Sequence, residues 1–353
     1  MSIKDIIRKN DKLYYLIYCI SKVNSKRFRE RVLTIRTNPY SILFDHYGTE
    51  NEDKVYYDII VGDETKGFCS AIRDTLYYLM YADALGFVPY IRYTDNIPYH
   101  EINPVNGKDN VFEYYFEQPS GIAYSELLHS SKVAHAESVH LKGNFTLHDL
   151  IQPTAYYSNE NFDIAICAEM YKKYIKPNSV VETKLQNDIE NLLPNGGKKV
   201  LGVHYRGTDF KVGYNGHPVA VQYQKHIDAV EKLMNTGKYN CIFLATEDGD
   251  IIESFQAKFG EKLYLYSDVV RGTGETNAYN MKNARENHHY LLGYEVMRDY
   301  YTLAACDAFV TSMSGVGITT QILKRSKGAQ FDTVVMLEAG INKSNKVLQK
   351  NKY

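Results

Sequence analysis

Short apolar runs that stop abruptly at polar or glycine-rich turns recur along this chain and predict its strands. We expect strands at residues 55–61, 87–91, 200–205, 241–245, 263–266, 308–311 and 334–337. Runs of small and β-branched residues without alternation are typical of parallel strands that are buried on both faces. The chain should therefore contain mainly parallel sheet.

Segments with helical spacing separate these strands. Helices are expected at residues 70–85, 221–234, 251–259, 289–305 and 319–323, and most of 146–189 should also be helical. Ser70 would cap the first of these helices and Gly86 would end it. Residues 95–121 are rich in Pro, Asn and Gly and indicate long loops. Alternation of strands and helices predicts parallel, doubly wound sheets.

The length of the chain favours two such units. It has 353 residues, and single cores stop growing at about 250–300 residues. Residues 194–197, Pro-Asn-Gly-Gly, form the strongest linker signal. We therefore expect a basic helical N-terminal arm at 1–45, an α/β domain at 46–193, a Rossmann-like domain at 194–330, and a last strand with a basic tail at 331–353. The two sheets would face a cleft.

Charge is balanced overall but uneven along the chain. The formal net charge is −1, which does not favour a bulk polyanion such as nucleic acid as a partner. The first 36 residues hold ten Lys or Arg against three Asp or Glu. The apolar run 13–20 within this arm is too short to span a bilayer, which takes about 20 residues. We expect a first helix packed on the domain; the alternative is a basic, aromatic helix resting on an anionic membrane face.

The cysteines and the missing targeting signals bear on location. Five cysteines lie far apart, with neither a zinc spacing nor a disulfide framework, so we expect reduced core residues. No small-residue cleavage site follows the apolar run 13–20, which does not favour a signal peptide. The protein is expected to be cytoplasmic, and peripheral at the inner face of the membrane if the arm binds lipid.

The most informative polar residues follow the predicted strand 200–205. His204, Arg206 and Asp209 lie at or just beyond its end. In open α/β sheets, ligands bind beyond the carboxyl ends of the strands. An arginine there can hold a phosphate through two parallel hydrogen bonds. These residues are the first candidates for chemistry.

A second strand, 241–245, ends in Glu247 and Asp248. Carboxylates at such a place can accept hydrogen bonds from a nucleobase edge or from ribose hydroxyls, or they can cap the next helix. Asp248-Gly249-Asp250 also has the Asp-x-Asp spacing with which some sugar transferases hold a divalent ion on a diphosphate. Three residues are a weak signal for a metal site.

Two further features bear on ligand binding. Asp299 shares a helical face with Leu292, Val296 and Leu303, and a carboxylate in an apolar stripe needs a structural partner or a ligand. Residues 311–320 follow a strand and open a helix with hydroxyl residues and glycines, among them Ser312, Ser314 and Gly315. Such turns present backbone N–H groups to anions.

Several common catalytic motifs are absent from the sequence. It has no nucleophile elbow, no Gly-Lys-Ser/Thr phosphate loop, no His-Glu-x-x-His and no Gly-x-Gly-x-x-Gly. This argues against an ordinary hydrolase, a P-loop kinase or a nicotinamide enzyme.

In the order and spacing of its motifs, the chain resembles the fucosyltransferases of the α1,6 and NodZ-like group. The likeness covers roughly residues 55–125 and 198–325. That family's His-x-Arg-Arg-Thr-Asp is matched by His-Tyr-Arg-Gly-Thr-Asp at 204–209, and its Leu-Ala-Thr-Asp-Asp by Leu-Ala-Thr-Glu-Asp at 244–248. Its Glu-Tyr-Tyr-Phe-Glu-Gln-Pro stretch is matched at 113–119, and its glycine-rich first turn at 67–69. Asp299 and residues 312–314 match a later helical aspartate and a serine-rich turn.

The resemblance implies a GT-B fold and a GDP-sugar as donor, with the acceptor side in the domain at 46–193 and the nucleotide-sugar site in the domain at 194–330. Carried over, Arg206 would bind the β-phosphate, Asp248 and Asp299 would contact guanosine or its phosphates, and Ser314 would hydrogen-bond the diphosphate. The expected donor-site residues are His204, Arg206, Glu247, Asp248, Asp299, Ser312, Ser314 and Gly315. The expected catalytic residues are Arg206, Asp209 and His217.

The chain departs from the family pattern at two places. Gly207 replaces the family's second arginine, which removes one positive charge. The family's glutamate base has no clear match, because counting onward reaches Asn215, with His217 two residues later. We name His217 as the candidate base; the alternative is a loop histidine with no catalytic role.

The predicted function is inverting, metal-independent transfer of a sugar, with fucose as the first choice, from a GDP-sugar to a hydroxyl of a glycan or lipid-linked glycan. No cofactor and no metal are expected. A basic N-terminus and Lys343, Lys346, Lys350 and Lys352 suggest an anionic or membrane-linked acceptor, such as one in bacterial surface-polysaccharide synthesis. The alternatives are another GDP-sugar such as a heptose, a metal-dependent Asp-x-Asp transferase, and a non-catalytic glycan-binding protein.

Overall fold

The computed structural model describes residues 44–62, 64–137, 164–194, 197–276, 278 and 285–346, together with residues 13, 16, 17, 20, 24 and 25. The side chain of Asp209 lies outside this description. Most of the predicted N-terminal arm, residues 146–163 of the predicted helical stretch, and Lys350 and Lys352 also lie outside it.

The N-terminal half is built on a four-stranded sheet. Its order is β1-β4-β2-β3, where β1 is Phe44–Asp45, β2 Tyr56–Val61, β3 Val88–Tyr93 and β4 Val133–Glu137. β2 pairs in parallel with β3 and β4, and β1 is antiparallel to β4. Helix α4 (Phe68–Leu85) crosses from β2 to β3 and ends at Gly86, whose φ of 66° is the left-handed value that favours glycine. This is the predicted βαβ unit.

Two expectations for this half were wrong. Helix α4 begins at Phe68 with Gly67 as its N-cap, so Ser70 lies within the first turn and does not cap it. The stretch predicted to form loops contains helix α5 (Val111–Tyr115), which is followed by α6 (Tyr124–Leu128). Asn110 caps α5 by accepting from the Phe112 N–H, and Val111 and Phe112 are fully buried. The polar composition of the segment concealed this short apolar stretch.

Helices α8 (Ile164–Tyr174) and α9 (Ser179–Leu192) lead to the second half. That half holds a five-stranded, fully parallel sheet of order β7-β6-β5-β8-β9. Its strands are β5 (Val200–Tyr205), β6 (Cys241–Thr246), β7 (Leu263–Tyr264), β8 (Ala308–Ser312) and β9 (Val334–Leu337). The predicted α/β class, with two largely parallel sheets, is confirmed.

Helices connect the strands of this second sheet in the alternation that the sequence predicts. They are α10 (Asp209–Val212), α11 (Tyr223–Met234), η2 (Gly249–Ile251), α12 (Ile252–Phe259), η3 (Gly260–Lys262), α13 (His288–Ala305) and α14 (Gly315–Ser326). α14 begins directly after β8, four residues before the predicted start, because Ser314 caps it.

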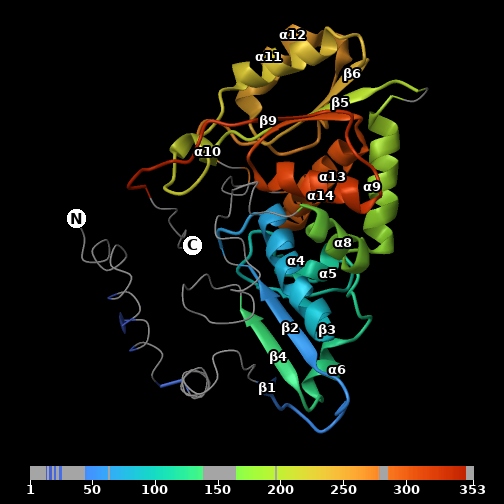
Figure 1. Ribbon diagram of the computed structural model, residues 1–353, viewed down its shortest axis with the longest axis vertical. Coiled ribbons are helices and arrows are strands. Elements are labelled where there is room, and N and C mark those ends of the chain that lie inside the picture. The colour runs from blue at the N-terminus through green and yellow to red at the C-terminus, as the bar shows by residue number, and fades with distance from the viewer. Residues whose placement is uncertain are drawn as a thin grey trace.

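The two halves share one hydrophobic core. Figure 1 shows α13 and α14 lying between the second sheet and helices α4 and α8 of the first half. Ile318 and Ile322 of α14 are fully buried in one cluster with Leu76 of α4 and Ala168 of α8. The hydroxyl of Tyr171 lies 3.1 Å from that of Tyr300 on α13. This cluster therefore ties α13 and α14 to the first half, while the strands of the second sheet are buried mainly in two further clusters.

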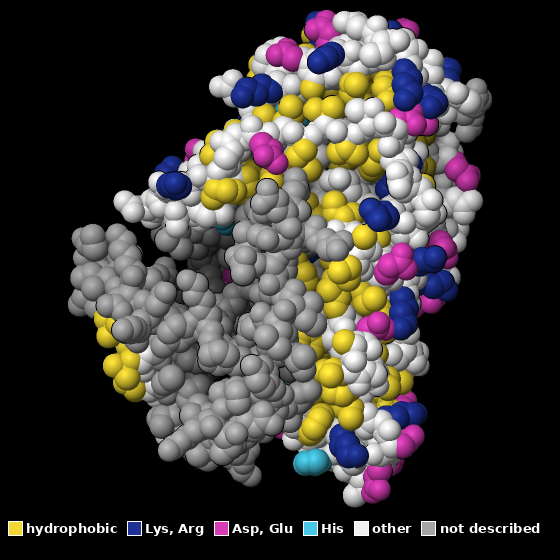
Figure 2. Space-filling view, viewed as in Figure 1, with side chains coloured by type: hydrophobic (Ala, Val, Ile, Leu, Met, Phe, Trp, Pro, Cys, Tyr) yellow, Lys and Arg dark blue, Asp and Glu magenta, His cyan; other side chains and the backbone are white. Residues whose placement is uncertain are grey.

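The surface mixes charges of both signs. In the view of Figure 2, Lys and Arg side chains alternate with Asp and Glu over the upper end and along one edge, beside a band of apolar side chains. Within the described residues, no helix is long and apolar enough to cross a membrane.

Candidate active site

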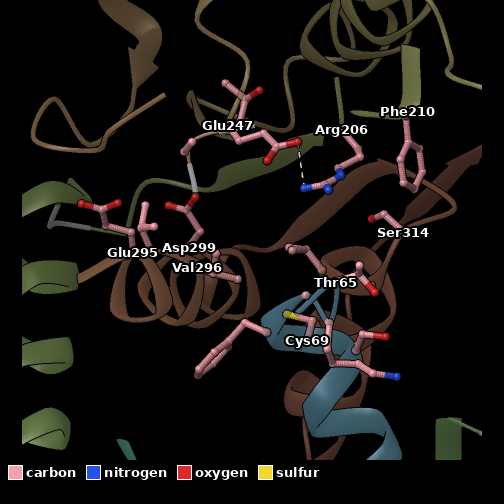
Figure 3. Close-up of a pocket in the computed structure, with 18 of the residues that line it drawn as sticks. Thr65, Cys69, Arg206, Phe210, Glu247, Glu295, Val296, Asp299 and Ser314 are labelled. Atoms are coloured by element: carbon pink, nitrogen blue, oxygen red, sulfur yellow. Dashed lines mark ion pairs between the residues drawn. The ribbon is translucent and has the colours of Figure 1, made fainter. Parts of the chain in front are cut away.

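A pocket of about 600 Å³ opens between the two halves. One wall comes from the loop before α4 and its first turns, and the other from the ends of β5 and β6, the middle of α13 and the start of α14. Figure 3 shows Arg206 and Glu247 above the pocket, Ser314 to one side, Asp299 of α13 to the other, and Cys69 of α4 below. The pocket thus lies at the carboxyl ends of the second sheet, where such folds bind ligands.

Arg206 points into this pocket from the end of β5. Its Nη1 lies 2.8 Å from Oε1 of Glu247, at the end of the neighbouring strand β6. Thr208 Oγ1 donates to the same carboxylate oxygen at 2.5 Å. The guanidinium also lies over the ring of Phe210, 5.3 Å from its centre. Arg206 is therefore held in place while part of its fork faces the pocket.

The turn after Arg206 is strained. Thr208 has a φ of 36°, a value that is rare for a β-branched residue and costs about 1–3 kcal/mol. Its side chain is fully buried, and its hydroxyl bonds to Glu247. The surrounding contacts thus hold the backbone in a shape that the sequence alone does not favour.

His204 and Ser314 join neighbouring strands beneath the pocket. Ser314 Oγ lies 3.2 Å from His204 Nδ1 and accepts the N–H of Gly317, which caps α14. Burial, together with the nearby positive charge of Arg206, lowers the pKa of His204 to about 3, so the ring is neutral at physiological pH. His204 therefore acts as a fixed hydrogen-bonding support for the turn. Ser312, the last residue of β8, is buried and does not line the pocket.

Two helices point their N-termini at the same space. α4 begins after Gly67 and α14 begins after Ser314, and a β-carbon on Gly315 would lie 3.4 Å from that of Cys69. The N-terminus of a helix carries about half a positive charge and exposes N–H groups. Together with Arg206, these two ends form a site suited to an anion.

The wall from the first half adds two cations that the sequence analysis missed. Lys66 and Arg73 both line the pocket and are buried, and Lys66 Nζ lies 2.8 Å from Asp74 Oδ2. Arg73 lies one turn beyond Cys69 and Ser70 on α4, on the same helical face. In the sequence, the only signal for these cations is a helix start next to a glycine-rich turn. That signal does not predict which cations face the second half.

An acidic, partly apolar region lies on the side of α13. Burial, partly offset by the nearby Arg298 and Arg271, raises the pKa of Asp299 to about 7. Leu292, Val296, Val269 and Val270 line the pocket around it. Glu295, one turn earlier, also lines the pocket, and burial raises its pKa although it pairs with Arg285 at 2.5 Å. The predicted apolar face around Asp299 therefore faces the pocket.

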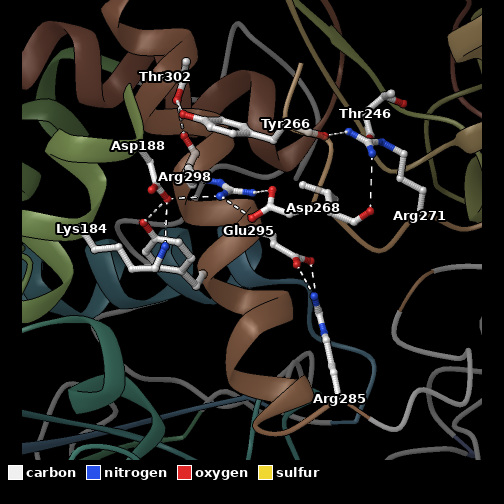
Figure 4. Close-up of polar contacts among 12 residues, drawn as sticks. Lys184, Asp188, Thr246, Tyr266, Asp268, Arg271, Arg285, Glu295, Arg298 and Thr302 are labelled. Atoms are coloured by element: carbon white, nitrogen blue, oxygen red, sulfur yellow. Dashed lines mark hydrogen bonds and ion pairs between the residues drawn. The ribbon is translucent and has the colours of Figure 1, made fainter. Parts of the chain in front are cut away.

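A network of arginines fixes α13 in its place (Figure 4). Arg298 donates to Asp268 at 3.0 and 2.6 Å and to Asp188 of α9 at 3.2 Å, and it lies 3.8 Å from the centre of the Tyr266 ring. Arg271 donates to the Tyr266 carbonyl at 2.6 Å and the Thr246 carbonyl at 3.2 Å. Because Arg298 precedes Asp299, this network sets the position of the pocket carboxyl.

Asp248 lies in a different environment from the one that the resemblance implies. It is fully buried, does not line the pocket, and accepts the N–H of Asp250 as the cap of η2. Lys211 Nζ lies 2.6 Å from Asp248 Oδ2 and 3.6 Å from Asp250 Oδ2. A lysine therefore occupies the space between the two carboxylates of the Asp-x-Asp motif. The described residues contain no cluster of three or more His, Cys, Asp or Glu with the geometry of a metal site.

His217 lies on the loop after α10 and lines the pocket with Asn215 and Gly216. Its ring makes edge contacts with those of Phe210 and Tyr214, with centres 6.2 and 5.8 Å apart. Of the expected site residues, the pocket brings together Arg206, Glu247, Asp299, Ser314, Gly315 and His217. His204 supports it from below.

Comparisons of the whole chain find similar solved structures. A NodZ α1,6-fucosyltransferase soaked with GDP-fucose is 15% identical with a TM-score of 0.48, and the match covers 76% of this chain and 93% of that one. The NodZ from Bradyrhizobium is 13% identical with a TM-score of 0.47, covering 77% and 93%. POFUT1 in complex with GDP-fucose is 11% identical with a TM-score of 0.43, covering 84% and 100%. No protein-family model matches the chain, and no curated protein matches it significantly.

Proposed function

We propose that this protein is a glycosyltransferase that takes its sugar from a GDP-sugar. The observation that carries the proposal is the division of one pocket into two chemical environments. Arg206 and two helix N-termini form a cationic part, and Asp299 lies in a part lined by Val296 and other apolar side chains. A nucleoside diphosphate has the same division, with an anionic diphosphate and a flat, polar-edged base.

Guanine is the base that suits Asp299 best. Its Watson–Crick edge presents the N1–H and N2–H groups side by side, and an ionised carboxylate can accept from both. Uracil offers one such donor, and adenine places an acceptor beside its amino group. A carboxylate in an apolar pocket gains most from a ligand that supplies two donors. This supports a preference for GDP over UDP and ADP.

The reaction we propose is inverting transfer without a metal. An acceptor hydroxyl attacks the anomeric carbon, the bond from that carbon to the β-phosphate oxygen breaks, and both electrons leave with GDP. Arg206 and the N–H groups at the starts of α4 and α14 would stabilise the growing charge on the diphosphate. His217 would take the proton of the hydroxyl, since it lines the pocket beside the loop before α4.

For the sugar and the acceptor, the proposal is based on the sequence motifs and not on the pocket. Fucose is the first choice because of the sequence motifs, and a glycan or lipid-linked glycan of a bacterial surface polysaccharide would be the acceptor. Gly207, which replaces an arginine of the fucosyltransferase motif, favours the alternative of another GDP-sugar such as a heptose. A cytoplasmic enzyme at the membrane face would fit such an acceptor.

Calorimetric titration with GDP, UDP and ADP, each with and without Mg²⁺, tests the proposal. We expect guanine-selective binding that does not need the metal and that Arg206→Ala abolishes. Binding that requires Mg²⁺, or a preference for UDP, would favour a metal-dependent transferase built on Asp248 and Asp250. Failure to bind any of the three nucleotides would favour a glycan-binding protein without activity.

A further inference from the structure

The segment after β9 lies along the loop that follows α10, and Figure 1 shows the two running together beside the second sheet. Backbone hydrogen bonds join them at four places: Val219 N to Gly340 O at 2.8 Å, Asn342 N to His217 O at 2.8 Å, Gly216 N to Asn342 O at 3.0 Å, and Asn215 N to Lys346 O at 2.8 Å. Two side chains add to them, Ser344 to the Gly213 carbonyl at 2.7 Å and Lys346 to the Val212 carbonyl at 2.9 Å. We call residues 340–346 the C-terminal clamp.

Asn342 is the centre of this clamp. Its backbone both donates to and accepts from the loop, and its Nδ2 donates to the carbonyls of His217 at 3.2 Å and Pro218 at 3.0 Å. Its amide also lies close to Gly213, where a β-carbon would come within 3.4 Å of Asn342 Oδ1. One residue thus fixes the loop on both sides of His217.

The loop that is held in this way carries Asn215, Gly216 and His217 into the pocket. The ring of His217 lies between those of Phe210 and Tyr214, which belong to α10 and to the same loop. With the His217 carbonyl bonded twice to Asn342, the backbone that carries the ring cannot turn without breaking both bonds. The direction of the imidazole therefore depends on a residue that does not line the pocket.

We infer that Asn342 is a positioning residue for His217, and that the C-terminal clamp is part of the construction of the active site. The inference rests on the proposed function for the role of His217. An imidazole of His217 held in the wrong position lowers the rate of the step that needs a base, because displacement of a catalytic group by about 1 Å can lower the rate about 10²-fold. The displacement of the imidazole should leave the cationic donor site unchanged, because that site is built from other elements.

The test uses the whole chain with Asn342→Ala and Asn342→Asp; the second keeps the size of the side chain but cannot donate. Asn345→Ala, at an exposed position of the same segment, is the matched control. Hydrogen exchange should show lost protection at the Gly216 and Val219 amides, with the amides of β5 and β6 unchanged. The control should exchange like the wild type.

Release of GDP from GDP-fucose, with water as the acceptor, supplies the kinetic measurement. We expect kcat to fall about tenfold in the Asn342 variants with the KM for GDP-fucose within about twofold of the wild type. His217→Ala should lose more, and the double variant should lose no more than His217→Ala alone, because Asn342 acts through His217.

Independent, multiplicative losses in the double variant would overturn the positioning role, and so would unchanged exchange at Gly216 and Val219. If the Asn342 variants lost GDP affinity and also lost exchange protection throughout the second sheet, Asn342 would be a merely structural residue. This outcome would also overturn the positioning role. If the wild-type protein binds no GDP, the proposed function fails, and the exchange measurement still decides whether Asn342 holds the loop.

Discussion

Gly207 and Asp248 approach each other so closely that a side chain at position 207 has no room. A β-carbon on Gly207 would lie 2.0 Å from Oδ2 of Asp248 and 2.7 Å from its Cβ. Asp248 cannot easily withdraw, because it is fully buried, paired with Lys211 and bonded to the N–H of Asp250. The arginine of the fucosyltransferase motif is therefore excluded here, and Lys211 supplies the cation beside this carboxylate.

Any side chain at position 207 should destabilise the fold. Gly207→Ala is expected to cost about 1–3 kcal/mol, as overpacking does in a well-packed region. Gly207→Arg should cost at least as much and should not tighten GDP binding. Urea unfolding measures the change, and Gly67→Ala is the control for an added β-carbon, because nothing lies within 4 Å of it and the substitution changes only the residue at a helix N-cap. An unchanged midpoint for Gly207→Ala would contradict the close approach.

Removal of Arg206 should reduce turnover strongly. Arg206→Ala is expected to lower kcat by roughly 10²–10³, the usual effect of removing one preorganised donor that faces developing charge. The kcat of Arg206→Lys should lie between those of the wild type and of Arg206→Ala, because an ammonium keeps the charge but not the planar fork of the guanidinium. GDP release from GDP-fucose measures both, with Arg325→Ala, an exposed arginine of α14, as control. Activity near that of the wild type would refute the assignment.

The binding of GDP should depend on pH through Asp299. Its pKa is raised to about 7, so near neutral pH the carboxyl is only partly ionised. Binding to guanine N–H groups favours the ionised form and should release a proton. Affinity should fall about tenfold per pH unit below 7 and level off above it. Calorimetry in buffers of different ionisation enthalpy measures the proton, and Asp299→Asn should abolish its release.

The same pKa shift also makes the stability of the fold depend on pH. Stability should fall as pH rises, whereas the affinity for GDP should increase. Because the folded pKa of Asp299 lies above its value of 3.8 in the unfolded chain, the folded state holds a proton that the unfolded state loses. This contribution to the free energy of unfolding is complete below about pH 4 and is lost as pH rises to about 7. Asp299→Asn should remove that decline. Parallel stability curves for the two proteins would argue against the shift.

Ser314 should contribute to both stability and binding. Ser314→Ala removes the cap of α14 and the hydrogen bond to His204, with an expected cost of about 1 kcal/mol. It should also weaken GDP binding, since the start of α14 faces the pocket. Ser326→Ala, at the other end of the helix, is the control for stability alone. Equal GDP affinity in the two variants would exclude Ser314 from the donor site.

The shared core should make the two halves unfold together. Ile322 lies on α14 but is fully buried among residues of both halves, and its replacement by alanine is expected to cost about 2–5 kcal/mol. Hydrogen exchange should show the same loss of protection at the β2 and β5 amides. Loss confined to β5 would mean that the first half folds independently.

The part of the site that lies at the carboxyl ends of the strands in the second sheet could be predicted from the sequence, because it depends on local patterns. Apolar runs located β5 and β9 at their observed bounds, and parallel neighbours must bring their carboxyl ends to one edge. The pattern of strands alone therefore places Arg206, Glu247 and Ser314 at the same edge. The helical spacing around Asp299 likewise predicted the face that lines the pocket.

The remaining parts depend on contacts between distant segments, for which the sequence holds no local signal. Lys66 and Arg73 reach the pocket only because α4 packs on α14. Asp248 has the motif position of a ligand-binding residue, but Lys211 and the Gly207 turn bury it. The role of Asn342 arises from hydrogen bonds across more than a hundred residues.

The hydrophobic cluster that the two halves share also limits how far they can move relative to each other. Rotating one half away from the other would expose Ile318 and Tyr300 to water, which loses the apolar burial that holds α13 and α14. We therefore expect the two halves not to open and close about a hinge when a ligand binds. The entrance to the pocket would then keep a nearly constant width, and the shape of the empty pocket would already be the shape that selects a ligand.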